Sequence, residues 1–196
     1  MDFDWNENTV IMDGEPYKRP PKTYRYCLTG NNDAKNPLVV IGLNPSTADN
    51  KEPDQTMRKV LSYFKNNKNE FDGFVMINLY PLRSPCPEEL RKSGIEKKIH
   101  EKNLESIKKH IESLNEPTIL LAFGANIVKI PGLADCFKEI VEEIKSYNPK
   151  WRYLDKTKEG HPKHLLYLPS NLKLKEFNID EYLDSSVIKN HLNNLI

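Results

Sequence analysis

Short apolar runs alternate with amphipathic helical patterns through most of this chain of 196 residues. The run at residues 38–43 is rich in Val, Ile and Leu, as is typical of strands that are buried on both faces of a parallel sheet. It leads into residues 55–66, whose apolar side chains recur at helical spacing behind Asp54, a predicted N-cap. Because strands joined by covering helices connect through right-handed crossovers, the alternation predicts a parallel sheet with helices on both faces.

The same alternation continues toward the end of the sequence. Further strands are predicted at residues 74–79, 118–123 and 151–154, and further helices at residues 96–114 and 133–147. We therefore expect an α/β fold, a three-layer αβα arrangement with a central, mainly parallel sheet of about four strands. We expect one domain, made of an N-terminal arm (about 1–35), a core (about 36–170) and a C-terminal helical closure (about 171–196), with residues 24–28 as an edge strand and residues 187–196 as a closing helix.

Composition excludes several classes of protein. Lys and Arg total 29 against 28 acidic residues, so no global field would hold a polyanion, and any nucleic-acid contact must be local. The three cysteines, Cys27, Cys86 and Cys136, lie far apart, which indicates neither a disulfide framework nor a metal site. No apolar run is long enough to span a bilayer, and the acidic first residues do not read as a signal peptide. We expect a cytoplasmic protein, a monomer, without a metal or cofactor.

Small polar residues follow the first two predicted core strands. Asn44, Ser46, Thr47 and Asp49 come directly after residues 38–43, and Asn78 lies at the end of the second strand. In open α/β sheets, ligands bind beyond the carboxyl ends of the parallel strands, so these side chains stand where a site is expected. The alternative is a turn whose side chains only satisfy local backbone groups.

The order of polar segments along the chain resembles that of the uracil-DNA glycosylase superfamily. The matching segments, over roughly residues 36–170, are Gly42-Leu-Asn-Pro-Ser, Met76-Ile-Asn, Leu120-Leu-Ala-Phe-Gly and His161-Pro-Lys. The chain is also similar to a bacterial and phage family catalogued as domain of unknown function 1643, for which no activity is established. That closer resemblance is carried by Leu43-Asn-Pro-Ser-Thr-Ala-Asp, Asn78-Leu-Tyr-Pro-Leu-Arg and Gly160-His-Pro-Lys-His.

The first resemblance implies cleavage of an N-glycosidic bond, a reaction that builds positive charge on the sugar and negative charge on the leaving base. It implies that Asn44 orients the attacking water and that His161 donates a hydrogen bond to the departing base. Asp49, the nearest carboxylate, is expected to act as the base, and the Asn78 amide to read the edge of a flipped nucleobase. Tyr80 or Phe123 is expected to stack on that nucleobase.

Phosphate contacts are expected from hydroxyl and basic side chains near the same strand ends. They are Ser46, Thr47, Arg83, Lys163 and His164. Lys163 also marks a departure from the superfamily, because it stands where the His-Pro-Ser motif has a serine. This departure leaves open a substrate other than uracil, or a site that is not catalytic.

Three functions are compatible with these residues. The first is a monofunctional DNA glycosylase-type hydrolase that removes a non-standard or modified base, from single- or double-stranded DNA. The second is a non-catalytic nucleic-acid or nucleotide binding module on the same fold. The third is a hydrolase of free nucleosides or nucleotides, which near-neutral charge suits better than duplex DNA.

Overall fold

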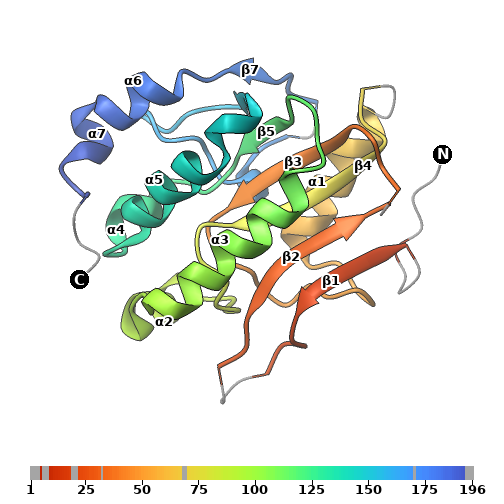
Figure 1. Ribbon diagram of the computed structural model, residues 1–196, viewed down its shortest axis with the longest axis horizontal. Helices are drawn as coiled ribbons and strands as arrows, with labels where there is room; N and C mark the ends of the chain where they lie inside the picture. Colours follow the sequence, from red (N-terminus) through yellow and green to blue (C-terminus); the bar gives the residue numbers. More distant parts are fainter. Residues whose placement is uncertain are drawn as a thin grey trace.

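A seven-stranded sheet runs through the middle of the computed structural model (Figure 1). The structure describes residues 5, 9–18, 22–31, 33–67, 70–169 and 171–192. The strands lie side by side in the order β1-β2-β4-β3-β5-β6-β7. Their bounds are Val10–Gly14 (β1), Arg25–Gly30 (β2), Pro37–Gly42 (β3), Gly73–Asn78 (β4), Thr118–Leu121 (β5), Lys150–Tyr153 (β6) and Lys175–Glu176 (β7).

The four strands at the centre of the sheet, β4, β3, β5 and β6, are parallel to one another. They are the four strands predicted from the apolar runs, so the α/β class and the parallel core are confirmed. The expected number of strands is wrong, because the antiparallel strands β1, β2 and β7 extend the sheet on both sides. The segment predicted as an edge strand is β2, an interior strand, and β1 forms the edge. Sequence reasoning missed β1 because its side chains are mostly exposed or half-buried, and β7 because it is only two charged residues.

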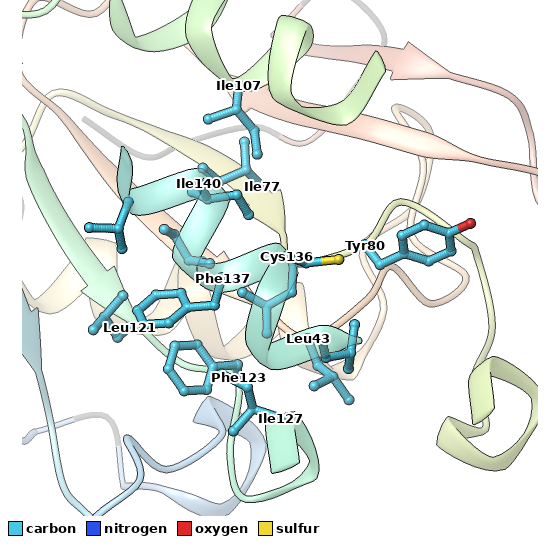
Figure 2. Packing of buried hydrophobic residues seen from close by; sticks show 14 of the residues in the cluster. Leu43, Ile77, Tyr80, Ile107, Leu121, Phe123, Ile127, Cys136, Phe137 and Ile140 are labelled. Carbon is cyan, nitrogen blue, oxygen red and sulfur yellow. The ribbon is translucent and has the colours of Figure 1, made fainter. Parts of the chain in front are cut away.

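Side chains of β3, β4 and β5 alternate between two hydrophobic clusters, one on each face of the sheet. In β3, Leu38 and Val40 belong to the cluster beneath α1, whereas Val39 and Ile41 belong to the cluster beneath α3 and α5. Figure 2 shows part of this second cluster, where Phe137 of α5 packs near Leu121, the last residue of β5, and near Phe123, which follows this strand. Burial on both faces explains why the core strands are continuous apolar runs.

The long helices agree with the helical spacing of the sequence. They are α1 (Gln55–Asn66), α3 (Lys97–Ile111) and α5 (Leu133–Ile144), the last extended by the 3-10 turn η1 (Lys145–Tyr147). Asp54 caps α1 as predicted, because its side chain accepts a hydrogen bond from the Met57 amide. The short elements, which lack a clear apolar period, are α2 (Pro87–Ser93), α4 (Asn126–Lys129), η2 (Leu165–Tyr167), α6 (Ile179–Asp184) and α7 (Ser186–Lys189).

The two terminal regions differ from the sequence-based expectation. The predicted N-terminal arm contributes β1 and β2 to the sheet and is therefore part of the fold. The predicted closing helix is reduced to α7, and its last residues, 193–196, lie outside the described residues. In the described ranges, no helix combines the length and the apolar character that crossing a membrane requires.

Candidate functional site

The loops at the carboxyl ends of the four parallel strands surround a cleft of about 890 Å³. Each strand is followed by residues that line the cleft. They are residues 43, 44, 46 and 47 after β3, residues 84 and 85 after β4, residues 123–126 after β5, and residues 157, 163 and 164 after β6. The start of α1 and the turn η2 complete the walls. The lining side chains that carry polar groups are Asn44, Ser46, Thr47, Asp54, Gln55, Thr56, Arg58, Ser84, Asn126, Thr157, Lys163, His164 and Tyr167.

Asn44 holds two of these loops together. Its Nδ2 atom donates to the carbonyl oxygens of Ser84 at 2.9 Å and Leu82 at 3.2 Å, and also lies 3.1 Å from the carbonyl oxygen of Pro45. Within the described part of the chain, its Oδ1 atom makes no hydrogen bond. The amide is therefore fixed in one orientation, with its acceptor oxygen available at the cleft.

Asp54 brings a carboxylate to the same cleft. One oxygen accepts from the Met57 amide at 2.9 Å, and the other accepts from the Ala48 amide at 3.2 Å. These bonds attach the loop after β3 to the first turn of α1. Asp54 thus caps the N-terminus of α1, where a side-chain oxygen satisfies an amide that has no partner within the helix.

His164 is the histidine that lines the cleft. Its Nδ1 atom accepts a hydrogen bond from the Leu166 amide at 3.2 Å, so in the neutral ring the proton is on Nε2. Burial lowers the pKa of His164 below its usual value, while the negative charge of Asp54 opposes this shift. His164 therefore presents a neutral N–H donor, a group suited to an oxygen or nitrogen acceptor on a ligand.

A small inner cavity of about 20 Å³ lies behind the cleft, between β3, β4 and the start of α1. Asn78 lines it and is 1% exposed, and neither polar atom of its amide has a partner among the described residues. Asn78 pairs in register with Gly42, and a Cβ atom at Gly42 would come within 2.7 Å of the Asn78 Oδ1 atom. The glycine therefore makes room for the Asn78 side chain beside the site.

His161, in contrast, points away from the cleft, although it was predicted to be catalytic. It is 2% exposed, and its Nδ1 atom lies 2.7 Å from the Tyr182 hydroxyl. It belongs to what we call the aromatic cluster, in which ring centroids of neighbouring residues lie 4.9 to 6.5 Å apart. The cluster consists of Phe123, Phe137, His161, Phe177 and Tyr182.

The two predicted stacking residues are core residues. Tyr80 is fully buried, and its hydroxyl accepts from the Glu96 amide at 3.0 Å, so its ring presents no face to a ligand. Phe123 contributes to the cleft wall but is 1% exposed, because its ring packs on Phe137 in the aromatic cluster (Figure 2). The exposed aromatic side chain at the cleft is Tyr167, which is 79% exposed and was not predicted.

Arg83 and Asp49 form hydrogen bonds to the backbone of the loop after β3 and do not line the cleft. Arg83 is 3% exposed, and its guanidinium donates to the carbonyl oxygens of Glu15, Thr47 and Ala48 at 2.7 to 3.0 Å. Asp49 accepts from the amides of Lys51 and Glu52 and closes a turn. The expected phosphate contact of Arg83 thus disagrees with its burial, and the carboxylate at the cleft is Asp54 instead of Asp49.

Three predicted phosphate-binding residues do line the cleft besides His164. They are Ser46, Thr47 and Lys163. The Lys163 ammonium lies 2.5 Å from Asp155, in a half-exposed ion pair. The sequence analysis did not predict Arg58, a second basic residue that lines the cleft. It lies in the first turns of α1, a helix that the sequence does predict.

No group of three potential metal ligands occurs among the residues that the structure describes. The cysteines are free thiols, with Cys27 and Cys136 buried and Cys86 exposed. Burial raises the pKa of both buried thiols, which keeps them protonated and unreactive. The polar groups that line the cleft are amides, an imidazole, hydroxyls, a carboxylate, a guanidinium and an ammonium.

Comparisons with known proteins identify a family. No curated protein and no solved structure matches the chain. One family model, described as protein of unknown function (DUF1643), matches residues 25–166, which include β2 to β6 and all residues that line the cleft except Tyr167. The match covers well over half of the sequence, and the chain therefore belongs to the DUF1643 family.

Proposed function

We propose that the protein hydrolyses the N-glycosidic bond of a non-standard or modified base in DNA, with water and without a cofactor. The observation that carries the proposal is the fixed amide of Asn44 at the carboxyl edge of the sheet. The order of polar motifs, which resembles that of the uracil-DNA glycosylase superfamily, supports the same reaction. Both point to a site where water is oriented beside a sugar.

Asn44 is assigned the attacking water. Because its Nδ2 hydrogens are directed to backbone carbonyls, only Oδ1 faces a ligand, and this oxygen accepts a hydrogen bond from the water. The water is thereby held with a lone pair available for the anomeric carbon. Asp54, the carboxylate at the cleft, is assigned to stabilise positive charge on the sugar and to take up the released proton.

His164 is assigned the role that the sequence suggested for His161. As negative charge develops on the departing base, the neutral Nε2–H group of His164 donates a hydrogen bond to it. Preorganised donors of this kind typically contribute two to three orders of magnitude in rate. His161 is not assigned this role because its Nδ1 atom is hydrogen-bonded to the Tyr182 hydroxyl.

DNA contact is assigned to the rim of the cleft. Tyr167 offers an exposed ring on which an unpaired base can stack, and Arg58, Lys163, Ser46 and Thr47 offer donors to phosphate oxygens. Stacking supplies sequence-tolerant affinity that a protein with a net charge of +1 cannot obtain from its overall field. These groups favour single-stranded or locally opened DNA.

A second candidate is a hydrolase of free nucleosides or nucleotides. The observation in its favour is the small number of available cations, since Arg83 is buried and Lys163 pairs with Asp155. A free nucleotide requires far fewer phosphate contacts than duplex DNA. The two candidates differ in which substrate loses its base.

The decisive experiment is mass spectrometry of the bases released from a panel of natural and phage-modified DNAs, with the corresponding free nucleosides as a second panel. Asn44→Ala should reduce release by about two to three orders of magnitude. Asp49→Ala is the matched control, because Asp49 lies in the same loop outside the cleft, and it should retain release. Circular dichroism establishes that both variants are folded.

Binding of DNA without release of any base would favour the non-catalytic binding module, and release from nucleosides alone would favour the second candidate.

A further inference from the structure

Two buried polar side chains meet at the inner cavity behind the cleft. Asn78, at the end of β4, and Arg25, at the start of β2, both line it. They are 1% and 2% exposed, respectively. The Asn78 Nδ2 and Oδ1 atoms and the Arg25 Nε atom have no hydrogen-bond partner among the described residues.

Such groups are costly to bury, and native proteins usually satisfy them. The rest of the Arg25 guanidinium is anchored, because its Nη1 atom donates to the Ala48 carbonyl at 2.6 Å. The Asn78 main chain is also fixed, since the side-chain Nδ2 atom of Asn103 donates to its carbonyl oxygen at 3.0 Å. Both side chains are almost completely buried, so neither can reach solvent to find a partner there.

We infer that the inner cavity is a binding site for one water molecule, held by Arg25 and Asn78 and linked to Asn44. Its volume of about 20 Å³ accommodates a single water, for which roughly 10 to 15 Å³ suffices. The water accepts from the Arg25 Nε–H and the Asn78 Nδ2–H groups. With both lone pairs occupied, it donates its two O–H bonds to residues that line the same cavity, the Asp54 carboxylate and Asn44 Oδ1, whose second lone pair remains for a ligand in the cleft.

Charge favours a neutral occupant. The Arg25 guanidinium would attract a small anion, but the Asp54 carboxylate lines the same cavity and opposes it. Burial, together with the nearby Arg83, lowers the pKa of Arg25 to about 10, which leaves it charged at neutral pH. A water satisfies both charged groups at once, because it can accept from one and donate to the other.

The bound water gives Asn78 and Arg25 a positioning role in the cleft. Backbone carbonyls already hold the Asn44 Nδ2 atom, and the water adds a hydrogen bond to the Oδ1 atom of the same amide. Gly42 maintains the space for this arrangement, because a Cβ atom there would approach both Asn78 Oδ1 and Met76 Cε within 2.7 Å. The inference is independent of whether a base is released.

A high-resolution crystal structure of the full chain tests the site directly. We expect one ordered water within about 3.2 Å of both Arg25 Nε and an Asn78 amide atom. Crystals grown with bromide distinguish a water from a small anion, because a bound bromide would produce an anomalous signal in the inner cavity. An anomalous peak, or clear side-chain density without the water, would overturn the inference.

Thermal unfolding of Asn78→Leu supplies a second readout. If the water is present, leucine expels it and leaves Arg25 Nε without a partner, so Tm should fall by about 2 to 4 °C. The matched control is Ser93→Ala, since the buried Ser93 hydroxyl lacks a partner in the described part and lines neither cavity. Its Tm should stay the same or rise. A rise in Tm for Asn78→Leu as well would show a dry cavity and would contradict the inference.

Discussion

The cleft and the aromatic cluster receive side chains from the same loop, yet they use them in opposite ways. His164 lines the cleft with its donor available, whereas His161, three residues earlier, is buried against Tyr182. Burial lowers the pKa of both imidazoles. A polar motif thus identifies a loop near a site, but packing decides which of its side chains reaches a ligand.

Two basic side chains near the strand ends show the same contrast between the cleft and the buried interior. Lys163 extends along the cleft wall into a half-exposed ion pair, whereas Arg83 is buried and donates to three backbone carbonyls. We therefore expect changes at cleft residues to alter activity or binding, and changes at buried residues to alter stability.

The largest expected effect concerns His164. His164→Ala should lower base release by about two to three orders of magnitude, because it removes the donor to the leaving base, with little change in unfolding free energy. Single-turnover base release checks the rate, and urea unfolding checks the stability. If instead His161→Ala lost release while remaining folded and His164→Ala kept it, the contrast between the two regions would be reversed.

Arg83→Ala should lower the unfolding free energy by about 3 kcal/mol, because it leaves buried carbonyls of the loop after β3 without donors. Urea unfolding monitored by fluorescence measures this change. The matched control is Arg58→Ala, an exposed arginine at the cleft, which should change stability by less than about 0.5 kcal/mol. Equal stability of the two variants would contradict a structural role for Arg83.

His161→Ala should cost about 2 kcal/mol of stability, since it opens a cavity in the aromatic cluster and leaves the Tyr182 hydroxyl unpaired. Tyr182→Phe removes only the hydroxyl and should cost about 1 kcal/mol. A double-mutant cycle measures the coupling between them. Absence of coupling would mean that the hydrogen bond contributes nothing to this region.

Acid should lower the free energy of unfolding through His100, a buried residue of α3 that is 2% exposed. Burial lowers its pKa to about 4, although the Nε2 atom lies 3.2 Å from a Glu139 oxygen without the alignment of a hydrogen bond. As the pH falls below about 6.5, the unfolded chain takes up a proton that the folded chain does not, so stability falls until the pH reaches about 4. In His100→Leu, the loss of stability between pH 7.5 and 5, measured with urea, should be smaller by roughly 1 to 2 kcal/mol. An unchanged loss would exclude His100 as its source.

The smallest effect is expected at Lys163. Lys163→Gln should reduce the slope of log affinity against log salt by about one unit for single-stranded DNA, because one phosphate contact is lost. Its ion pair with Asp155 is half-exposed, so stability should change by less than about 1 kcal/mol. Fluorescence anisotropy at several salt concentrations measures the slope. An unchanged slope would place the DNA contacts elsewhere or favour a free nucleotide as the ligand.

The sequence by itself determined the parallel core and its helices. Continuous Val, Ile and Leu runs specify strands buried on two faces, and the apolar spacing behind Asp54 specifies α1 to the residue. It also located the loops at which Asn44, Ser46, Thr47, Lys163 and His164 line one cleft, because parallel strands bring their carboxyl ends to one edge of the sheet.

Only the tertiary structure decided which polar side chains face that cleft. The local sequence around His161 and His164, or Arg83 and Lys163, contains no signal that separates a buried residue from one at the site. The difference arises from contacts with residues distant in sequence, such as Tyr182 for His161 and Glu15 for Arg83. The same is true of β1, whose pairing with β2 makes it part of the sheet despite its exposed side chains. Sequence periodicity reports local burial, whereas the site depends on long-range packing that no local pattern encodes.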